Sequence, residues 1–322
     1  MSDQEPAAAG QSEFWCPRCH GAALFWNDRV LDCSACGFVA PIVRGVPVLI
    51  NDANSVFAAA DYVTDAQYTG ASYGSPSDKT GGLRGFYRRM TYAMAEFAIG
   101  GAEEQDADTA LTRFCEAAPT RPRVLVIGAG DTRYTQPADV VYTDVAHAPH
   151  LAAIADGHDL PFADQSFDFV LAIAVLEHVA DPPRVVSEIW RVLRAEGQVY
   201  AATPFLQPVH MGAYDFTRFT YLGHRRLFRW FAEINSGMAL GPGAVAAWSV
   251  KSVCASMARS RRGRQIASLI GLVLGLPLKF LDYRARHSPS AIDSAGGVFF
   301  HGRKQDRPIS DREMIGLYRG GF

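Results

Sequence analysis

The chain has 322 residues and a formal net charge of -2, with 48% hydrophobic and 20% charged residues. This composition is that of an ordinary folded protein with a substantial core, and the length suggests two units, one of them small. Because the chain lacks the excess of positive charge that binds polyanions, nucleic acid is not the expected partner. The N-terminal stretch MSDQEPAAAGQSEF lacks the basic start and apolar run of a secretory signal, which predicts a cytoplasmic protein with reduced thiols.

Four of the six cysteines form two Cys-x-x-Cys pairs separated by thirteen residues. This spacing lets four thiolates converge on one tetrahedral ion, and zinc prefers that geometry and those soft ligands. Four protein ligands leave no position for a substrate, so the expected zinc is structural. His20 follows a cysteine directly and is expected to be a neighbour of the site. The expected metal ligands are Cys16, Cys19, Cys33 and Cys36.

The residues around these cysteines predict a compact β-rich module. The pattern from Cys16-Pro17-x-Cys19 to Cys33-x-x-Cys36-Gly37, followed by PIVRGVPVLI, resembles the small zinc-binding domain of the activator subunit that supports several tRNA and protein methyltransferases. The resemblance implies a built-in stabilising or docking module that covers an apolar edge of a methyltransferase. A zinc ribbon that contacts RNA is the alternative.

Three regions are expected along the chain: a zinc-binding module over residues 1–52, a linker and helical connector over 53–120, and an α/β domain over 121–322. Apolar runs that alternate with helical patterns predict a parallel sheet in the last region. The expected strands are 124–127, 140–143, 169–174, 198–202 and 296–304. The expected helices are 83–99, 106–118, 181–197 with Asp181 as its cap, and one that begins near Tyr221.

The stretch VLVIGAGDTRYTQPADVVYTD predicts a nucleotide-binding turn between two strands. Gly128 and Gly130 let the backbone turn sharply beside a ligand, and Asp144 ends the next strand, where a carboxylate accepts hydrogen bonds from ribose hydroxyls. Arg133 stands where a dinucleotide-binding turn has its third glycine, so close approach of a pyrophosphate is disfavoured.

S-adenosylmethionine has no pyrophosphate and suits this shortened turn. Arg133 or exposed backbone N–H groups are candidates to hold its carboxylate, with Asp131 facing its amine. The alternative is that Asp131 and Arg133 form a solvated pair of loop residues.

The following segment, ADGHDLPFADQSFDFVLAIAVLEHVADPP, closely resembles class I S-adenosylmethionine-dependent methyltransferases of the type 11 group. This resemblance implies a Rossmann-like sheet with helices on both faces. It implies that Asp156 binds the adenine amino group, that Gly157 and His158 lie beside the ring, and that Ala172 and Ile173 form the wall near the methionine part.

The region after the strand QVYAATP is expected to form a lid over residues 205–220. His210 is the first candidate for a general base, with Asp215 or His178 next, because transfer of a methyl group to a hydroxyl is helped by one positioned base. The alternatives are that His178 only closes its turn and that Asp215 and Arg218 form an internal ion pair. The pattern PVH with YDF and RFT also resembles methyltransferases of glycan or natural-product biosynthesis.

Residues 244–292 are expected to be a helical insertion that contains a basic and apolar stretch. Arg259, Arg261, Arg262 and Arg264 precede an apolar run that is too short and too interrupted to span a bilayer. A buried helix between the last two strands is favoured. The alternative is peripheral contact of residues 259–281 with the inner face of a membrane, with Leu269, Leu272, Val273 and Leu276 facing inward.

The sequence thus predicts an S-adenosylmethionine-dependent methyltransferase whose acceptor is a small molecule or glycan, methylated on oxygen. An rRNA or tRNA methyltransferase that reads its substrate with the zinc module, and a non-catalytic partner subunit that binds S-adenosylmethionine, are the alternatives. The sequence does not indicate an oligomeric state.

Overall fold

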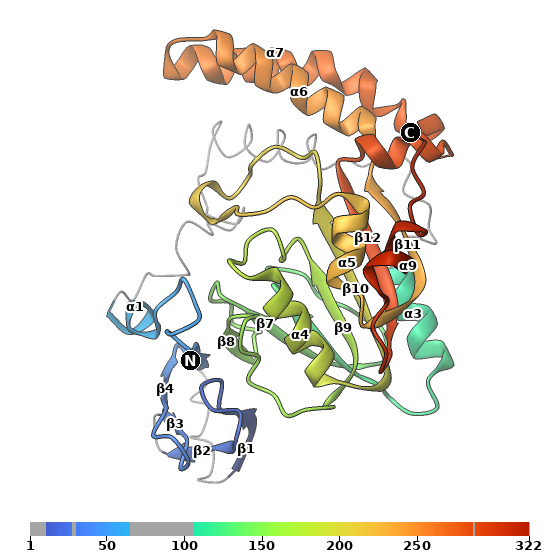
Figure 1. The fold of residues 1–322 in the computed structure, drawn as a ribbon. Helices are drawn as coiled ribbons and strands as arrows, with labels where there is room; N and C mark the ends of the chain where they lie inside the picture. The colour runs from blue at the N-terminus through green and yellow to red at the C-terminus, as the bar shows by residue number, and fades with distance from the viewer. Residues whose placement is uncertain (1–10, 28–29, 65–105, 286, 322) are drawn as a thin grey trace.

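The computed structural model describes residues 11–27, 30–64, 106–285 and 287–321. A small N-terminal module of short strands lies beside a larger α/β domain, and a pair of long helices lies at the opposite side of that domain (Figure 1). The strands are β1 (Gln11–Trp15), β2 (Ala23–Asn27), β3 (Val30–Asp32), β4 (Val39–Val43), β5 (Val46–Leu49), β6 (Arg123–Ile127), β7 (Asp139–Asp144), β8 (Ala153–Ala155), β9 (Phe167–Ile173), β10 (Leu193–Pro204), β11 (Phe231–Leu240) and β12 (Gly297–Lys304).

Among the described residues, helices lie in the connections from β5 to β6, from β9 to β10, from β10 to β11 and from β11 to β12, and one follows β12. The helices are α1 (Ala59–Thr64), α3 (Ala107–Ala117), α4 (Pro182–Val192), η2 (Gly212–Tyr214), α5 (Tyr221–Leu227), α6 (Pro242–Met257), α7 (Arg261–Lys279), α8 (Asp282–Ala285), η3 (Pro289–Ser294) and α9 (Asp311–Ile315). The helix expected over 83–99 lies outside the described residues. The connections from β6 to β7 and from β7 to β8 contain no helix.

The α/β domain is built on a mostly parallel sheet with strand order β8-β7-β6-β9-β10-β12-β11. The first five of these strands run parallel, and β12 is antiparallel to both β10 and β11. The order reverses between β6 and β9, and in such sheets ligands bind outside the carboxyl ends of the strands at the point of reversal.

Two expectations for the second half of the domain were wrong in detail. The helix that begins after Asp181 ends at Val192, and Leu193 already starts β10. The helix that begins at Tyr221 ends at Leu227, and strand β11 follows, although its sequence FAEINSGMAL shows little alternation. Pairing with β12 along its length holds β11 in the sheet, so tertiary context decides this strand.

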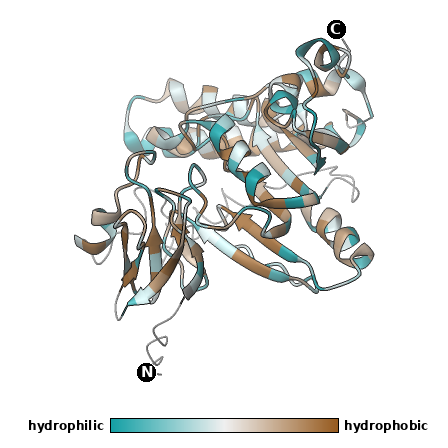
Figure 2. Cartoon of the chain, turned by 60° about the horizontal axis from the view of Figure 1, so that its bottom comes forward, coloured by the Kyte–Doolittle hydropathy of each residue, from teal (hydrophilic) through white to brown (hydrophobic). Residues whose placement is uncertain are grey.

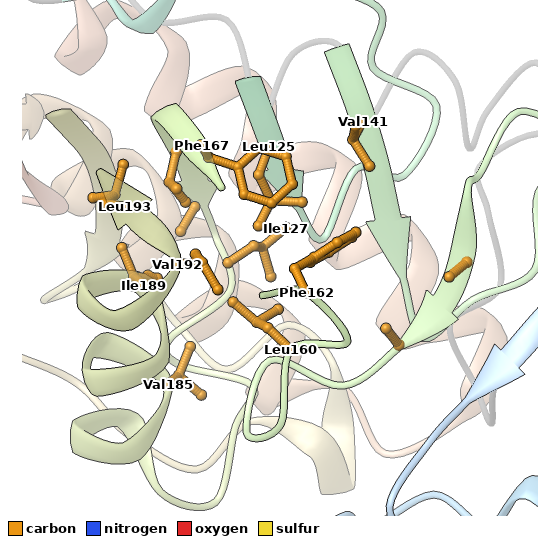
Figure 3. Packing of buried hydrophobic residues seen from close by; sticks show 14 of the residues in the cluster. Leu125, Ile127, Val141, Leu160, Phe162, Phe167, Val185, Ile189, Val192 and Leu193 are labelled. Carbon is orange, nitrogen blue, oxygen red and sulfur yellow. The ribbon is translucent and has the colours of Figure 1, made fainter. Parts of the chain in front are cut away.

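Successive residues of each strand point to opposite sides of the sheet, and in the central strands both sets are apolar. Helices therefore cover both faces of the sheet. Leu125 and Ile127 pack in the same cluster as Val185 and Ile189 of α4 (Figure 3). The intervening residue Val126 packs in a second cluster, which includes Leu111 of α3. The central strands are accordingly apolar along most of their length (Figure 2). This is the Rossmann-like fold class expected from the sequence.

The N-terminal module (residues 11–49) continues the sheet of the α/β domain. Strand β5 pairs in parallel with β8, with Val48 opposite Ile154. Phe14 and Phe162 place their ring centroids 5.9 Å apart, so the module and the domain share one core. The module thus covers the edge strand β8, which would otherwise present unpaired backbone groups.

Residues 51–64, here called the bridging segment, fall where composition predicts a linker, but they pack against the α/β domain. Tyr62 is buried, and its hydroxyl donates a hydrogen bond of 2.6 Å to the backbone carbonyl of Val145. The Phe57 ring stacks on Tyr214 with a centroid distance of 5.4 Å. The bridging segment therefore connects the N-terminal module to the carboxyl edge of the sheet.

The expected insertion between the last two strands forms an antiparallel pair of helices, the α6–α7 hairpin (residues 242–279), which lies away from the sheet (Figure 1). Two glycines bring its helices together. A Cβ atom at Gly271 would lie 2.7 Å from Lys251 Cα, and one at Gly275 would lie 2.8 Å from the Ala247 carbonyl oxygen. The expectation of a buried helix was wrong, because only 28% of the most apolar part of Arg261–Ala285 is buried. The expectation that this run is too short to span a bilayer was also wrong, because by length and composition the helix could cross a membrane.

Candidate functional site

The glycine turn lies at the carboxyl end of β6, at the point where the strand order reverses. Gly128 and Gly130 have φ values of +65° and +52°, a conformation that L-residues rarely adopt. A Cβ atom at Gly128 would lie 2.5 Å from Val175 Cγ2, so glycine is also required by the close approach of the β9–α4 connection. The turn leads into β7 without a helix, and the N–H groups of Ala129 and Gly130 donate to the Thr143 carbonyl and the Asp144 carboxylate at the end of that strand.

Asp144 ends β7 and faces this turn. Its carboxylate is 7% exposed and accepts hydrogen bonds from the backbone N–H groups of Gly130 at 2.8 Å and Ala146 at 2.7 Å. Burial raises the pKa of Asp144, and these backbone hydrogen bonds oppose the shift. A carboxylate has about four acceptor positions. The carboxylate of Asp144 is thus fixed by backbone donors and keeps acceptor capacity, which suits a vicinal pair of ribose hydroxyls.

Asp156 follows β8, one strand further along the same edge. Its Oδ1 accepts hydrogen bonds from the backbone N–H and the ring Nδ1 of His158, at 3.1 and 2.6 Å. Its Oδ2 accepts one from the Ser55 hydroxyl at 2.5 Å. Three of about four acceptor positions are thus occupied, and the remaining one, on Oδ2, suits a single N–H donor such as the adenine amino group.

The two residues after Asp156 support this carboxylate. The Nε2 atom of His158 accepts a hydrogen bond of 3.0 Å from the Asp181 N–H, so the proton lies on Nδ1 and is donated to Asp156. A Cβ atom at Gly157 would lie 3.1 Å from Val185 Cγ1, which places α4 directly against the backbone. His158 thus connects Asp156 to the start of α4, and both its ring nitrogens are used within the protein.

The other expected cofactor residues lie along the same edge but differ in exposure. Ala172 is fully buried in the core, whereas Ile173 is 38% exposed at the end of β9 and offers an apolar wall. Asp131 and Arg133 are exposed in the turn. The Arg133 guanidinium lies over the Tyr142 ring at 5.6 Å and donates to the Thr132 carbonyl, so its own turn holds it.

Residues 205–220, the expected lid, lie at the carboxyl end of β9. The backbone N–H of Phe216 donates a hydrogen bond of 2.8 Å to the Glu177 carbonyl oxygen, which fixes the lid to the turn after β9. This contact brings together three side chains, because the Nε2 atoms of His178 and His210 lie 3.0 Å apart and 3.7 and 3.8 Å from Glu177 Oε1. The sequence predicts both histidines, and the structure adds Glu177.

Glu177 differs from Asp215, the other buried acid beside the two histidines, because its oxygens have no hydrogen-bond partner. Its side chain is 1% exposed, and neither carboxylate oxygen has a hydrogen-bond partner. Burial raises its pKa to about 8. Sequence reasoning passed over it because a single Glu beside a His has no distinctive spacing.

Asp215 has its partners within the lid. Its carboxylate forms an ion pair with Arg218 and accepts a hydrogen bond of 2.9 Å from the backbone N–H of His210. Burial raises the pKa of Asp215, but its bonds with Arg218 and His210 lower it overall. The internal ion pair that the sequence offered as an alternative is therefore present, and it positions His210.

Asp159 joins the N-terminal module to the domain beside the candidate adenine site. Its carboxylate accepts hydrogen bonds from Asn51 at 3.0 Å and Asn54 at 2.8 Å, forms an ion pair with Arg184 at 2.5 Å, and lies 3.4 Å from His20 Nε2. Burial raises the pKa of Asp159, but these partners outweigh it and lower the pKa to about 2. His20 thus serves the junction and is not a fifth member of the cysteine cluster.

The four cysteines converge within the N-terminal module. Their Sγ atoms all lie within 4.8 Å of one another, with Cys16 and Cys36 at 3.5 Å and Cys19 and Cys33 at 3.7 Å. Zinc–sulfur bonds of about 2.3 Å at tetrahedral angles separate sulfurs by about 3.8 Å. The cluster therefore has the dimensions of a four-thiolate metal site.

The fold and the site define the class of protein. An α/β sheet with a glycine turn at its point of reversal and acids at the ends of the two following strands is a nucleoside-binding domain of the Rossmann-like type. The shortened turn and the acid after β8 are consistent with the methyltransferase type that the sequence resembles.

Part of the chain is similar to known methyltransferases. Residues 127–201 match the profile of a family described as Methyltransferase domain. An uncharacterized protein of Methanocaldococcus jannaschii is 35% identical over 86 residues, which are 24% of this chain and 42% of that protein. An uncharacterized methyltransferase of Mycolicibacterium vanbaalenii is 44% identical over 73 residues, which are 22% of this chain and 28% of that protein.

Among solved structures, phosphoethanolamine N-methyltransferase 2 of Haemonchus contortus, in complex with phosphomonomethylethanolamine and S-adenosylhomocysteine, is similar to this chain. The two are 16% identical with a TM-score of 0.42, and the similarity covers 69% of this chain and 57% of that chain. The chain spans less than half the length of the two curated relatives described above.

Proposed function

We propose that the protein transfers a methyl group from S-adenosylmethionine to a hydroxyl group of a small molecule or glycan. The observation that carries this proposal is the arrangement of Asp144 and Asp156 at the ends of adjacent strands, each fixed by protein donors and each with acceptor positions left over. Together they match the ribose hydroxyls and the amino group of an adenosine.

The residues of the turn fit this methyl donor better than a dinucleotide. The donor would lie across the ends of β6, β7 and β8, with its adenosine on Asp144 and Asp156 and its methionine part between the glycine turn and Ile173. When bound, it supplies an electrophilic methyl group on a positively charged sulfur. The protein contributes position and exclusion of water, which dominate the rate of such a displacement.

We also propose that the cysteine cluster holds a zinc ion with a structural role. The sulfur separations fit a tetrahedral ion, and four thiolates leave no coordination position open for a substrate. The ion would fix the N-terminal module, whose strand β5 completes the edge of the sheet.

The acceptor is proposed to be uncharged or weakly charged and of modest size. The chain has a net charge of -2, and a polyanionic substrate would be expected to meet a basic surface around the site. The side chains on the acceptor side are instead the lid residues around His178 and His210, near the end of β9.

Isothermal titration calorimetry with S-adenosylmethionine tests the site. We expect micromolar binding to the wild type and at least about tenfold weaker binding to Asp144→Asn and Asp156→Asn, since each loses a charged acceptor worth about 1.5 kcal/mol or more. Asp306→Asn, an exposed acid after β12, is the matched control and should bind normally. Absence of binding to the wild type would refute the proposal, and equal binding to all variants would refute the assigned site.

Transfer of labelled methyl groups into fractionated cell extract tests the acceptor. The label is expected in a low-molecular-weight or glycan fraction that resists ribonuclease, and mass spectrometry of the product should locate the methyl group on oxygen. Label that is lost on ribonuclease treatment would instead identify an RNA methyltransferase.

A further inference from the structure

The turn after β9 holds a buried carboxyl group whose oxygens have no hydrogen-bond partner among the described residues. Glu177 is 1% exposed, and neither of its oxygens accepts a hydrogen bond. Buried carboxylates are almost always paired with a cation or hydrogen-bonded, because desolvation of an unpaired charge is costly. The Nε2 atoms of His178 and His210 lie 3.7 and 3.8 Å from Glu177 Oε1, so a cation held between the three side chains would compensate this burial.

Two histidines present their Nε2 atoms to the same place. His178 Nδ1 lies 2.7 Å from the backbone carbonyl of Tyr214, and because a carbonyl only accepts, Nδ1 carries the proton and Nε2 does not. His210 Nδ1 lies 3.4 Å from the Asp215 carboxylate, which favours the same tautomer in that ring. An outer partner on Nδ1 that leaves Nε2 free of a proton is the usual arrangement of metal-binding histidines.

The separations of the three ligand atoms fit one ion. Metal–ligand bonds of about 2.1 Å place two ligand atoms about 3.0 Å apart at a right angle and about 3.4 Å apart at a tetrahedral angle. The Nε2 atoms are 3.0 Å apart, and Glu177 Oε1 lies 3.7 and 3.8 Å from them, so shifts of a few tenths of an ångström complete the geometry.

We propose that Glu177, His178 and His210 bind a divalent metal ion of borderline hardness, such as Mn²⁺, Fe²⁺, Co²⁺ or Zn²⁺. Two imidazoles and one carboxylate suit these ions and leave coordination positions open. This site is separate from the cysteine cluster in ligands and in place, because it joins the turn after β9 to the lid.

The open positions suit the oxygens of an acceptor, and this part of the inference rests on the proposed methyl transfer. A hydroxyl that binds the ion releases its proton to solvent, because the metal lowers its pKa. The oxygen lone pair then forms a bond to the methyl carbon while the carbon–sulfur bond breaks and its electrons remain on sulfur. The products are a methyl ether and the neutral thioether S-adenosylhomocysteine. An acceptor with two adjacent oxygens, such as a vicinal diol or catechol, would occupy two positions of the ion.

Titration of the full-length protein, purified with zinc retained in its cysteine cluster, with Mn²⁺, followed by electron paramagnetic resonance, tests the site without methyl transfer. Mn²⁺ is suitable because it disfavours four-thiolate sites. We expect one bound Mn²⁺ per chain in the wild type and at least tenfold weaker binding in Glu177→Gln and His210→Ala. His287→Ala, an exposed histidine after α8, is the matched control and should bind normally.

The zinc content of the cysteine cluster and the melting temperature of each variant show whether the fold is retained. Two results would overturn the metal site. The first is a folded wild type that binds no Mn²⁺ and takes up no second equivalent of Co²⁺ or Zn²⁺. The second is a folded Glu177→Gln variant that binds Mn²⁺ as tightly as the wild type does. S-adenosylmethionine binding is measured separately, so failure of the metal site and failure of the proposed function are distinguishable.

A second inference comes from the α6–α7 hairpin, whose outer face is apolar and exposed. Ile266, Ile270, Val273 and Leu274 recur at helical spacing on α7 and are 62%, 52%, 53% and 61% exposed. The inner face of α7 packs against α6 through Gly271 and Gly275. Leu272 is buried on the same face. The outer stripe therefore has no partner among the described residues of the hairpin.

The charge of the hairpin indicates what covers this stripe. Residues 242–279 contain six Lys and Arg residues and no Asp or Glu, whereas the whole chain has a net charge of -2. Four of the six are exposed arginines at the turn between the helices, namely Arg259, Arg261, Arg262 and Arg264. A helix with an apolar face and a basic end is typical of binding in the plane of an anionic membrane surface.

We infer that the α6–α7 hairpin lies on an anionic phospholipid surface and holds the protein at the inner face of a membrane. The hairpin base is tied to the domain, because the buried Asp282 accepts hydrogen bonds from the N–H groups of Gly243 at 2.6 Å and Ala244 at 3.0 Å. This attachment and the packing of α7 along α6 favour a peripheral position over a membrane crossing.

Flotation of the full chain with vesicles tests this inference. We expect recovery with phosphatidylcholine vesicles containing 30% phosphatidylglycerol, little recovery with pure phosphatidylcholine, and loss of recovery in Ile270→Asp/Leu274→Asp. The matched control is Val63→Asp/Ile315→Asp, which changes two exposed apolar residues elsewhere and should float as the wild type does. A wild type that stays with the soluble fraction would overturn the inference. It would also be overturned if analytical ultracentrifugation showed a concentration-dependent dimer that Ile270→Asp/Leu274→Asp abolishes, while flotation of that variant is unchanged.

Discussion

The Ser55 hydroxyl lies 2.5 Å from Asp156 Oδ2, so the segment that follows the N-terminal module is hydrogen-bonded to the candidate adenine-binding carboxylate. The same hydroxyl accepts a hydrogen bond of 3.0 Å from the Phe57 N–H, and Phe57 in turn stacks on Tyr214 of the lid. The bridging segment thus contacts both the cofactor side and the acceptor side of the site.

This relationship predicts the effect of Ser55→Ala. The variant removes one of the donors that orient Asp156, and a hydrogen bond to a charged group contributes about 1.5–3 kcal/mol at most. We expect S-adenosylmethionine to bind about three- to tenfold more weakly by calorimetry, with little change in melting temperature. Ser256→Ala, which removes an exposed hydroxyl on α6, is the control. Unchanged affinity in Ser55→Ala would show that the bridging segment does not support the site.

The acid stability of the fold should depend on Asp159. Its folded pKa of about 2 lies below the ordinary aspartate value of 3.8, so the stability that the charged form contributes is complete above about pH 4 and is lost as the pH falls toward 2. We expect Asp159→Asn to lose about 2 kcal/mol of unfolding free energy at pH 7 and to show a weaker dependence on pH between 4 and 2.

Urea denaturation at several pH values measures this difference against the wild type. Asp306→Asn is again the control, because an exposed acid should change the free energy of unfolding by less than about 0.5 kcal/mol. Equal acid dependence in the wild type and Asp159→Asn would contradict the assigned role of this ion-pair cluster.

Alanine substitutions at two glycines should separate the destabilisation caused by backbone strain from that caused by steric clash. Gly128→Ala has both costs, because φ is +65° and the new Cβ would lie 2.5 Å from Val175 Cγ2. Gly45→Ala, in the turn between β4 and β5, has only the first, since φ is +83° and no atom lies within 4 Å of its Cβ. We expect about 1 kcal/mol of destabilisation for Gly45→Ala and about 2–4 kcal/mol for Gly128→Ala.

Thermal denaturation tests this prediction. Val175→Ala introduced into Gly128→Ala should recover part of the loss, because it removes the clashing methyl groups. Equal destabilisation by the two single glycine substitutions would show that Val175 yields and that only the φ value matters at Gly128.

Removal of the proposed zinc should weaken the α/β domain as well as the N-terminal module. We expect Cys33→Ser to lose one equivalent of zinc and to lower the melting temperature by about 10 °C or more, since structural zinc contributes directly to folding free energy. Hydrogen exchange should rise at Ala153–Ala155, because β8 pairs with β5 of the module. Cys254→Ser, on α6, is the control and should retain zinc. Unchanged zinc content and unchanged exchange at β8 in Cys33→Ser would show that the cluster does not hold a zinc ion that stabilises the sheet.

The sequence by itself determines the parts of this protein that local pattern encodes. The spacing of the four cysteines, the glycines of the turn and the acids at the strand ends are set by short-range geometry, and the structure brings them to the expected places. The helix after Asp181 was also predictable, because its cap and apolar stripe lie within one segment. Its end was not, since Leu193 leaves the helix to pair with Phe167 of β9.

Only the tertiary structure decides the features that depend on contacts between distant residues. The pairing of β5 with β8 joins residues about a hundred positions apart, and the meeting of Glu177, His178 and His210 requires the lid to bind the turn after β9. Composition predicts a linker at residues 51–64, yet Ser55 and Phe57 place this segment on the site. The apolar run of α7 has the same hydropathy whether it is buried or exposed, and its exposure follows from the glycines that pack it on α6 and leave the outer face uncovered.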